Sequence, residues 1–363
     1  MRVGLVIYGS LDTVSGGYLY DRRLVGALRE AGDQVEIISI PWRNYARHLT
    51  DNWSSDLLRR MRGRFDVLLQ DELNHPSLAW ANGHLRRGHP PFEGPLVAIV
   101  HHLRVSELRP AWQNRLYGIV ERRYLRSVDG FVANSRTTQR EVESMIGRPR
   151  PHVVAYPAGN RFQAHRSGHD VVRKRRDREP LRLLFVGNLI PRKGLHILLA
   201  ALALVSADWR LRVVGSPLLA PKYVRRCRAQ ADSAGWGERI AWCGALSDAG
   251  LASEMAAADV LVVPSEYEGF GIVYLEGMGF GLPAVATTGG GAPEIITDGE
   301  NGYLIAPGDA PALAGRIEAL AADRVLLARM RRSALDHYAA HPTWAMTTSA
   351  IRNFLVDLTR RGD

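Results

Sequence analysis

Two glutamates, Glu268 and Glu276, stand on either side of the glycine-rich and apolar run GFGIVYL (269–275). A carboxylate among apolar neighbours costs free energy unless it is paired or faces a polar cleft. The run before the first glutamate, DVLVVPS (259–265), predicts a buried strand, and the run after the glycines predicts a helix. The two acids therefore flank a helix start at the carboxyl end of a strand, where open α/β sheets bind ligands.

Such a helix start has the groups to bind an activated sugar. Backbone amides at a helix N-terminus bind phosphate, and a carboxylate accepts hydrogen bonds from neighbouring hydroxyl groups. The amides concerned belong to Phe270, Gly271, Ile272 and Val273. Together with the two acids they would bind a nucleotide diphosphate sugar. The residues alone leave a structural alternative open, in which Glu276 pairs with an arginine.

Two other glycine loops have features of an anion site. The sequence SGG, with Gly16 and Gly17, lets the backbone approach a ligand just before a predicted helix. The loop GNLIPRKG (187–194) places Arg192 and Lys193 before another helix, which is slightly unfavourable unless an anion lies between these cations and the helix dipole. For each loop, an ordinary solvated turn is the alternative. Neither matches a dinucleotide fingerprint or a P-loop, which disfavours dehydrogenases and P-loop NTPases.

An alternation of strands and helices positions these loops, and it occurs twice. Predicted strands, each a nearly continuous apolar run, lie at 2–9, 34–40, 65–70, 95–102 and 129–135, and again at 181–188, 209–216, 239–246, 259–265 and 283–288. Such runs are typical of parallel strands covered on both faces. We therefore predict an α/β protein with two doubly wound domains in tandem.

A polar, charged run at 165–180 is interpreted as the linker between the domains. We predict an N-terminal domain over 1–165 and a C-terminal domain over 166–344. The tail, at about 345–363, predicts an amphipathic helix that packs back on the first domain.

Composition indicates a globular protein with material for two cores, because 46% of its 363 residues are hydrophobic and 23% are charged. Two cysteines and no apolar run of transmembrane length lead us to expect a cytoplasmic protein.

The net charge of +10 attracts anionic partners, and arginines cluster at 58–64, 120–127 and 171–178. A solvated basic surface is the alternative to an anionic membrane. None of these clusters alternates with aromatic residues as a single-strand binding face would, so no nucleic-acid partner is expected.

The segment 265–309 closely resembles the donor-binding segment of the family 4 retaining glycosyltransferases, which have the GT-B fold. The matching elements are an E-x7-E pair, GLP, GGGAPE and DGENG, at 268–276, 281–283, 289–294 and 298–302. The resemblance covers nearly the whole chain, and the E-x7-E block is highly specific. It implies two Rossmann-like domains that face each other across a cleft, the first for the acceptor and the second for the sugar donor.

For the donor, the resemblance implies that Glu268 holds hydroxyls of the transferred sugar and Glu276 the ribose. The amides of residues 270–273 would contact sugar and diphosphate, with Gly16 and Gly17 closing over the diphosphate from the other domain. Lys193 matches the family's phosphate-binding lysine.

The sequence departs from the family pattern at one position, and several other residues match positions that the family uses near the acceptor. Asn188 stands where the family has an arginine, and Arg192 is our candidate to replace that charge. His101 matches the histidine beside the reacting sugar, whereas its neighbour His102 is a weaker candidate. Three residues after the 65–70 strand would face the acceptor, although a structural role for the histidine is equally open: Asp71, Glu72 and His75.

The activity implied is retaining transfer of a sugar from a UDP- or GDP-sugar to an acceptor hydroxyl on a lipid or a glycan. The departing phosphate oxygen would take the acceptor's proton. No D-x-D triplet occurs, so neither a catalytic metal nor a cofactor is expected. The alternatives are a nucleotide-sugar epimerase of the same fold and an inactive, nucleotide-binding, membrane-associated subunit. A lipid acceptor would place the protein peripherally on the inner face of the membrane.

Overall fold

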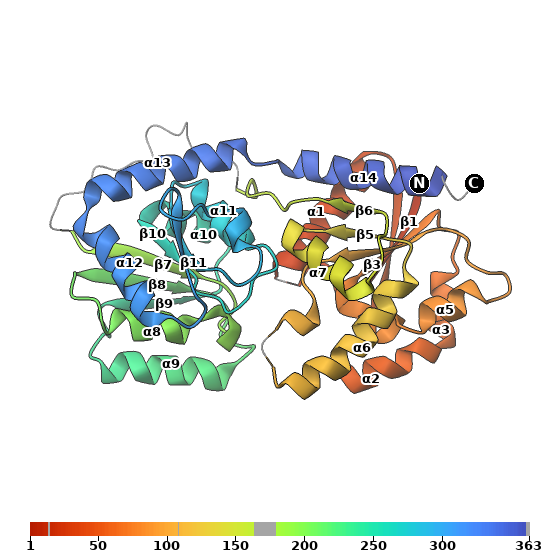
Figure 1. The fold of residues 1–363 in the computed structure, drawn as a ribbon, viewed down its shortest axis with the longest axis horizontal. Helices are drawn as coiled ribbons and strands as arrows, with labels where there is room; N and C mark the ends of the chain where they lie inside the picture. Colours follow the sequence, from red (N-terminus) through yellow and green to blue (C-terminus); the bar gives the residue numbers. More distant parts are fainter. Residues whose placement is uncertain (14, 108, 163–178, 361–363) are drawn as a thin grey trace. The chain divides into compact units, whose positions relative to one another are not determined.

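A computed structural model describes residues 1–13, 15–107, 109–162 and 179–360 (Figure 1). The chain forms two compact units, Met1–Pro157 with Pro342–Asp363 (unit 1) and Ala158–His341 (unit 2). The boundary expected between residues 165 and 166 lies outside the described residues. No helix in the described ranges is long and apolar enough to cross a membrane.

Unit 1 contains a six-stranded parallel sheet in the order β2-β1-β3-β4-β5-β6. The strands are β1 (Arg2–Tyr8), β2 (Gln34–Ile40), β3 (Val67–Asp71), β4 (Leu96–Val100), β5 (Gly130–Ala133) and β6 (His152–Val154). Every residue of β3, β4 and β5 is buried, because helices cover both faces of the sheet. The apolar runs of the sequence therefore become the centre of the first core.

The helices of unit 1 follow the strands along the chain. They are α1 (Gly16–Glu30), α2 (Tyr45–Thr50), α3 (Ser55–Met61), α4 (His75–Leu78), α5 (Ala81–Arg86), α6 (Ala111–Ser127), α7 (Arg136–Ile146) and α14 (Trp344–Arg360), with 3-10 turns η1 (Asp51–Trp53), η2 (Glu72–Asn74) and η3 (Arg104–Ser106). Although it ends the chain, α14 packs on α1 and β6. Thr347 donates a hydrogen bond to the carbonyl of Tyr156 (2.6 Å), and Arg352 pairs with Asp33 (2.7 Å).

Unit 2 contains a second six-stranded parallel sheet, ordered β12-β11-β10-β7-β8-β9. Its strands are β7 (Leu181–Val186), β8 (Trp209–Val214), β9 (Ile240–Gly244), β10 (Val260–Val262), β11 (Ala284–Thr287) and β12 (Gly302–Ile305). Its helices and turns are η4 (Pro191–Lys193), α8 (Leu195–Leu202), α9 (Pro221–Ser233), α10 (Asp248–Ala257), α11 (Ile272–Met278), η5 (Ala292–Glu294), α12 (Ala310–Ala322) and α13 (Arg324–Ala340). The predicted pair of doubly wound α/β domains is confirmed.

Each sheet has a point where the strand order reverses, and ligands bind at the carboxyl ends of the strands there. In unit 1 the reversal lies between β1 and β3, and in unit 2 between β7 and β10. The loops predicted to bind ligands follow these strands. The fold therefore places the candidate residues of each unit at a ligand-binding edge.

Candidate functional site

Two loops meet at the switch point of unit 2: residues 187–194 after β7, and residues 264–268 after β10. The amide of Glu266 donates a hydrogen bond to the carbonyl of Arg192 (2.8 Å). The Arg192 guanidinium donates in return to the carbonyl of Tyr267 (2.5 Å). The basic loop and the acidic loop are thus joined by one backbone hydrogen bond and by the Arg192 side chain.

Glu268 is buried between these loops, with 7% of its surface exposed. Its Oε1 atom accepts a hydrogen bond from the Ser265 hydroxyl (2.6 Å) and forms an ion pair with Lys193. Burial alone would raise the pKa of Glu268, but the charges of Lys193 and Arg192 outweigh burial and lower this pKa below its usual value. Glu268 is therefore ionised at neutral pH, and Lys193 neutralises it.

The glycines at 289–291 hold the backbone of Glu268 in place. The Glu268 amide donates to the carbonyl of Gly289 (3.0 Å), and the amide of Gly291 donates to the carbonyl of Glu268 (2.7 Å). A Cβ atom on Gly290, whose φ is +90°, would lie 1.9 Å from that same carbonyl oxygen. Only glycine allows this close approach of two backbones, which explains the glycine run next to the acidic loop.

Helix α11 begins at Ile272, shortly after Glu268, and the amides predicted to bind phosphate, residues 270–273, lie on either side of this helix start. Gly271 precedes the helix with a φ of +96°, and a Cβ atom there would lie 2.4 Å from the Tyr274 ring. This left-handed residue lets the chain turn sharply from the acidic loop into the helix. The first amides of a helix have no partner within it, so this end of α11 offers hydrogen-bond donors to an anion.

Glu276 lies one turn further along α11 and is buried, with 4% of its surface exposed. The guanidinium of Arg161 is 3.7 Å from its Oε1 atom and also pairs with Asp248. The arginine pairing that the sequence left open is therefore present, at a distance too long for a direct hydrogen bond. It does not exclude a ligand, because Arg161 has a second acid to pair with.

Asn188, where the family has an arginine, begins the basic loop and is half-buried. Its side chain makes no hydrogen bond to any described residue, and its carbonyl accepts one from the amide of Ile190 (2.8 Å). The second positive charge acting on Glu268 comes from Arg192. Our expectation that Arg192 replaces the family arginine remains a prediction.

In unit 1, His101 follows β4 and faces helix α1. Its Nε2 atom is 3.2 Å from an oxygen of Asp21, and a Cβ atom on Gly17 would lie 3.0 Å from its ring. The Asn134 side chain donates to the His101 carbonyl (2.7 Å). Burial would lower the pKa of His101, but Asp21, and more weakly Asp71, raise it to about 9. The histidine is therefore an imidazolium at neutral pH.

Asp21 was not predicted from the sequence. It is fully buried on α1, and its second carboxylate oxygen has no hydrogen bond to a described residue. A signal was available, because Asp21 shares a helix face with Gly17, Leu24 and Leu28, at spacings of four, three and seven. Burial, and then the charge of Asp21, raise the pKa of Asp71 to about 7. Asp21, Asp71 and His101 lie close enough together to hold a metal ion.

The other predicted acceptor residues occupy two different environments. Glu72 and His75 are almost completely buried in a second cluster, with Glu121 of α6, which the sequence did not single out. His102 is half-exposed and lies 3.1 Å from a carboxylate oxygen of Glu107. A role for these residues in acceptor binding remains a prediction.

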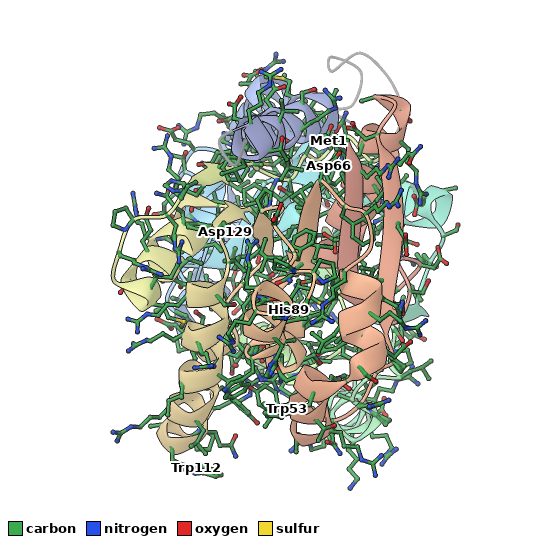
Figure 2. All side chains as sticks on the ribbon, turned by 90° about the vertical axis from the view of Figure 1, so that its right-hand side faces the viewer. Met1, Trp53, Asp66, His89, Trp112 and Asp129 are labelled. Atoms are coloured by element: carbon green, nitrogen blue, oxygen red, sulfur yellow. The ribbon has the colours of Figure 1, made fainter. Side chains whose placement is uncertain are left out.

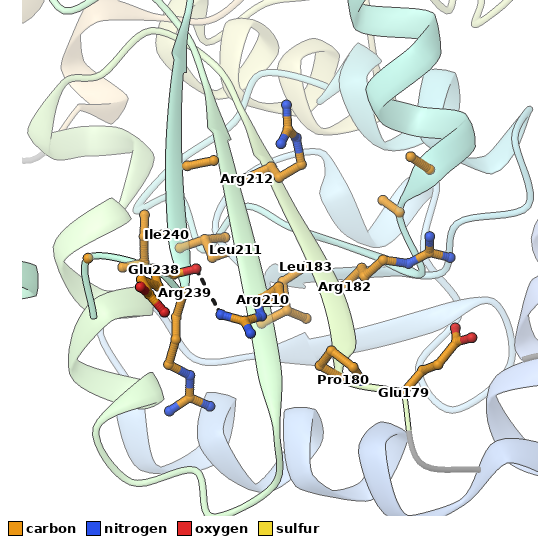
Figure 3. A pocket seen from close by; sticks show the side chains of 14 residues that line it. Glu179, Pro180, Arg182, Leu183, Arg210, Leu211, Arg212, Glu238, Arg239 and Ile240 are labelled. Carbon is orange, nitrogen blue, oxygen red and sulfur yellow. Dashed lines mark hydrogen bonds between the residues drawn. The ribbon is translucent and has the colours of Figure 1, made fainter. Parts of the chain in front are cut away.

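A cavity of about 490 Å³ lies at the amino ends of β7, β8 and β9, the edge of the sheet away from the acidic loop (Figure 3). Four arginines line it: Arg182, Arg210, Arg212 and Arg239. All four already have partners, because three form ion pairs and Arg210 donates to the Glu238 carbonyl (2.8 Å). We assign no anion site to this cavity.

Both halves of the chain match glycosyltransferase models. Residues 18–160 match the model described as Glycosyltransferase Family 4, and residues 170–337 match the one described as Glycosyl transferases group 1. The chain belongs to the family 4 glycosyltransferases. The resemblance drawn from the E-x7-E block is confirmed.

The chain is similar to several glycosyltransferases. The phosphatidyl-myo-inositol mannosyltransferase of Mycobacterium leprae is 29% identical over 91% of this chain and 90% of its own. A D-inositol 3-phosphate glycosyltransferase of Geodermatophilus obscurus is 30% identical over 67% of this chain and 55% of its own.

Among solved structures, sucrose-phosphate synthase of Thermosynechococcus elongatus has a TM-score of 0.84 at 20% identity, covering 99% of both chains. Anabaena Alr3699/HepE in complex with UDP-glucose has a TM-score of 0.75 at 22% identity, covering 98% of this chain and 100% of its own. These structures show the shared GT-B fold.

The close backbone approach at Gly290 predicts a large effect of a single methyl group. Gly290→Ala adds both a left-handed alanine and a contact with the Glu268 carbonyl, so we expect it to lower the free energy of unfolding of unit 2 by ~2–4 kcal/mol. Gly299→Ala is the matched control, because Gly299 has a φ of +80° with no atom within 4 Å of its Cβ position. That control isolates the cost of the backbone angle, ~1–2 kcal/mol. Urea unfolding measures both, and equal losses would contradict the contact.

The charge of Asp21 predicts the titration of His101. Asp21→Asn removes the main cause that raises the pKa of His101, so we expect this pKa to fall from about 9 to below the usual value of 6.5. In the wild type the raised pKa stabilises the fold below pH 6.5, and this contribution is lost as the pH rises through 9. In the variant it should be absent.

Titration of the ring by NMR measures this pKa directly, and Asp56→Asn on the exposed surface of α3 serves as control. An unchanged pKa of His101 in Asp21→Asn would contradict the assignment.

Proposed function

We propose that unit 2 binds a nucleotide-diphosphate sugar, a UDP- or GDP-sugar, and that the protein transfers this sugar to an acceptor hydroxyl with retention of configuration. The observation that carries the proposal is the buried, ionised Glu268, held by Lys193 and Arg192 beside the first turn of α11. A carboxylate, two cations and helix amides at one strand switch point offer groups for both halves of such a donor: the diphosphate and the sugar hydroxyls.

The residues suit a reaction in which the leaving diphosphate gains negative charge. Lys193 and the amides of the first turn of α11 would stabilise that charge as the sugar bond breaks. Glu268 would accept hydrogen bonds from hydroxyls of the transferred sugar, and Glu276 from the ribose. The departing phosphate oxygen would accept the proton of the attacking hydroxyl.

His101 fits the same scheme as a hydrogen-bond donor. A histidine with a pKa of about 9 already carries its proton at neutral pH, so it cannot serve as the general base. Its positive charge would instead stabilise the donor's negative oxygens or orient a sugar hydroxyl. The absence of a neutral histidine here favours the phosphate as the proton acceptor.

The names of two similar proteins support this choice of substrates. The solved Anabaena structure contains UDP-glucose, and the relative from Mycobacterium leprae is named for mannosyl transfer and for an inositol lipid. We infer a lipid-linked acceptor for this chain, because unit 1 also carries a surface suited to a membrane.

That surface is the outer face of α6. Trp112, Leu116 and Ile119 follow one another at spacings of four and three, and each is more than half exposed. Arginines continue the exposed face: Arg115, Arg122, Arg123 and Arg126. Trp53, also exposed, lies at the same end of unit 1 as Trp112, opposite Met1 and Asp66 (Figure 2). Exposed apolar side chains flanked by arginines bind anionic interfaces, so we propose peripheral attachment through this face.

The donor site predicts how single charges affect binding. We expect one class of nucleotide sugar to raise the Tm of the wild type. Transfer or slow hydrolysis of that same sugar should also be detectable. Glu276→Gln should weaken donor binding by ~10–100-fold, because a hydrogen bond to a charged group is worth about 1.5–3 kcal/mol. Lys193→Ala should lower kcat by ~100-fold or more.

Glu238→Gln, at the opposite edge of the same sheet, is the control and should leave both quantities unchanged. Undiminished transfer in a Glu268→Gln, Glu276→Gln double variant would refute the proposal, and release of an epimerised nucleotide sugar would identify an epimerase instead.

The membrane surface predicts charge-dependent binding to vesicles. Sedimentation with phosphatidylglycerol vesicles at low salt should retain the wild type, and phosphatidylcholine vesicles should retain much less. Trp112→Asp with Ile119→Asp should weaken binding at least tenfold, because both lose apolar contact and gain repulsion. Leu218→Asp changes a still more exposed apolar residue, in unit 2, and should have no effect. Equal binding of all three proteins would contradict the role of α6.

A further inference from the structure

A second cluster of ionisable side chains lies in unit 1, apart from His101 and Asp21. Glu72 comes from η2, His75 begins α4, and Glu121 lies in the middle of α6. All three are buried, with 4%, 1% and 0% of their surfaces exposed. One ligand atom of each lies within 4.8 Å of the others. Three segments of the chain thus bring two carboxyl groups and an imidazole together inside the protein.

The carboxyl groups of this cluster have little positive charge beside them, because Arg104 acts on Glu72 without pairing with it. The Oε1 atom of Glu72 is buried and has no hydrogen bond to a described residue, although His75 Nδ1 is 2.9 Å away. No lysine or arginine in the described ranges forms an ion pair with Glu72 or Glu121. The guanidinium of Arg104, whose charge acts on Glu72, stacks on the rings of Tyr45 and Tyr117, at 4.9 and 4.6 Å. Two adjacent buried carboxyl groups require either a shared proton or a bound cation.

The types and spacing of these side chains match a transition-metal site. Glu72 and His75 have the i, i+3 spacing of the Glu-x-x-His pair that binds metals in helical carboxylate proteins. The third donor, Glu121, comes from a different helix and completes a set of two oxygens and one nitrogen, which suits Zn²⁺ or Mn²⁺. The His75 Nε2 atom lies 3.1 Å from the Tyr45 hydroxyl, which leaves Nδ1 to face the ion. This Nδ1 atom lies 2.9 Å from Glu72 Oε1 and 3.1 Å from the Glu72 carbonyl oxygen, a hydrogen bond that an ion would replace.

We propose that Glu72, His75 and Glu121 bind one divalent transition-metal ion, Zn²⁺ or Mn²⁺, that fastens η2 and α4 to α6. The ion is structural, and it is separate from donor binding in unit 2. Glu121 also accepts hydrogen bonds from the amides of Arg104 (2.5 Å) and Val105 (3.3 Å). An ion at Glu121 therefore also steadies the chain three residues after His101.

The test is metal content and metal-dependent stability of the full chain. The purified protein is stripped with a chelator, and ZnCl₂, MnCl₂ or MgCl₂ is then added. We expect one equivalent of Zn²⁺ or Mn²⁺ by elemental analysis after desalting, and a rise in Tm of ~5 °C or more when the ion is at about 100 times its Kd. Magnesium should have little effect, because an imidazole ligand does not suit it.

Two variants and two controls show which side chains bind the ion. Glu121→Gln and Glu72→Gln should each lose the bound equivalent and the rise in Tm, with circular dichroism of the stripped proteins showing that they fold. Glu143→Gln removes the acid of a partly exposed pair, between Glu143 of α7 and His152 of β6, and should behave as the wild type. Asp71→Asn tests the cluster around His101. If the wild type neither retains nor responds to an ion, the two acids share a proton and the proposal is wrong.

The proposal is equally wrong if both glutamine variants keep the response, or if only Asp71→Asn loses it. Should neither glutamine variant fold, anomalous scattering from crystals of the zinc-loaded wild type decides the matter, and an ion anywhere but between these three side chains overturns the assignment.

Discussion

A charge buried in a protein must have a partner, and in unit 2 that requirement fixes the geometry of the whole candidate site. Glu268 is almost completely removed from water, so it needs Lys193 and the Ser265 hydroxyl beside it. Lys193 lies on the loop after β7, and Glu268 on the loop after β10. The two loops can meet only because β7 and β10 are neighbours in the sheet, at the place where the strand order reverses.

The glycines of unit 2 serve the same requirement. A carboxylate can be held beside a lysine only if its backbone is fixed, and the run 289–291 fixes it by lying directly against residues 266–269. Gly271 then turns the chain so that α11 starts where the acidic loop ends. The motifs of the sequence are therefore parts of one arrangement: two buried acids, a lysine that balances one of them, and glycines that allow the loops to approach closely.

Much of this arrangement could be predicted from the sequence. The apolar runs predicted the parallel strands, because a strand covered on both faces has no alternation to obscure it. The short edge strands β6 and β12 and the helices α2 to α5 were not predicted, since their pairing and packing depend on neighbours distant in the chain. The pair Glu268 and Glu276 was recognised by its spacing.

Three features of the sites depend on tertiary contacts and could not be predicted from the spacing of residues in the sequence. They are the ion pair of Glu268 with Lys193, the approach of Arg161 to Glu276, and the burial of Glu72 and His75 against Glu121. Each joins residues from separate segments. Asp21 is the exception, because its position on the apolar face of a helix was visible before the structure.

The pairing of Lys193 with Glu268 has a consequence for selectivity. The charges of Lys193 and Glu268 cancel each other, so a small anion such as free phosphate would have to separate the lysine from its carboxylate and leave that carboxylate buried alone. A molecule that brings negative oxygens for the lysine together with hydroxyl groups for the carboxylate compensates both at once. If unit 2 binds a nucleotide sugar as proposed, this pairing would disfavour the abundant simple anions of a cell before any contact with the base or the acceptor is made.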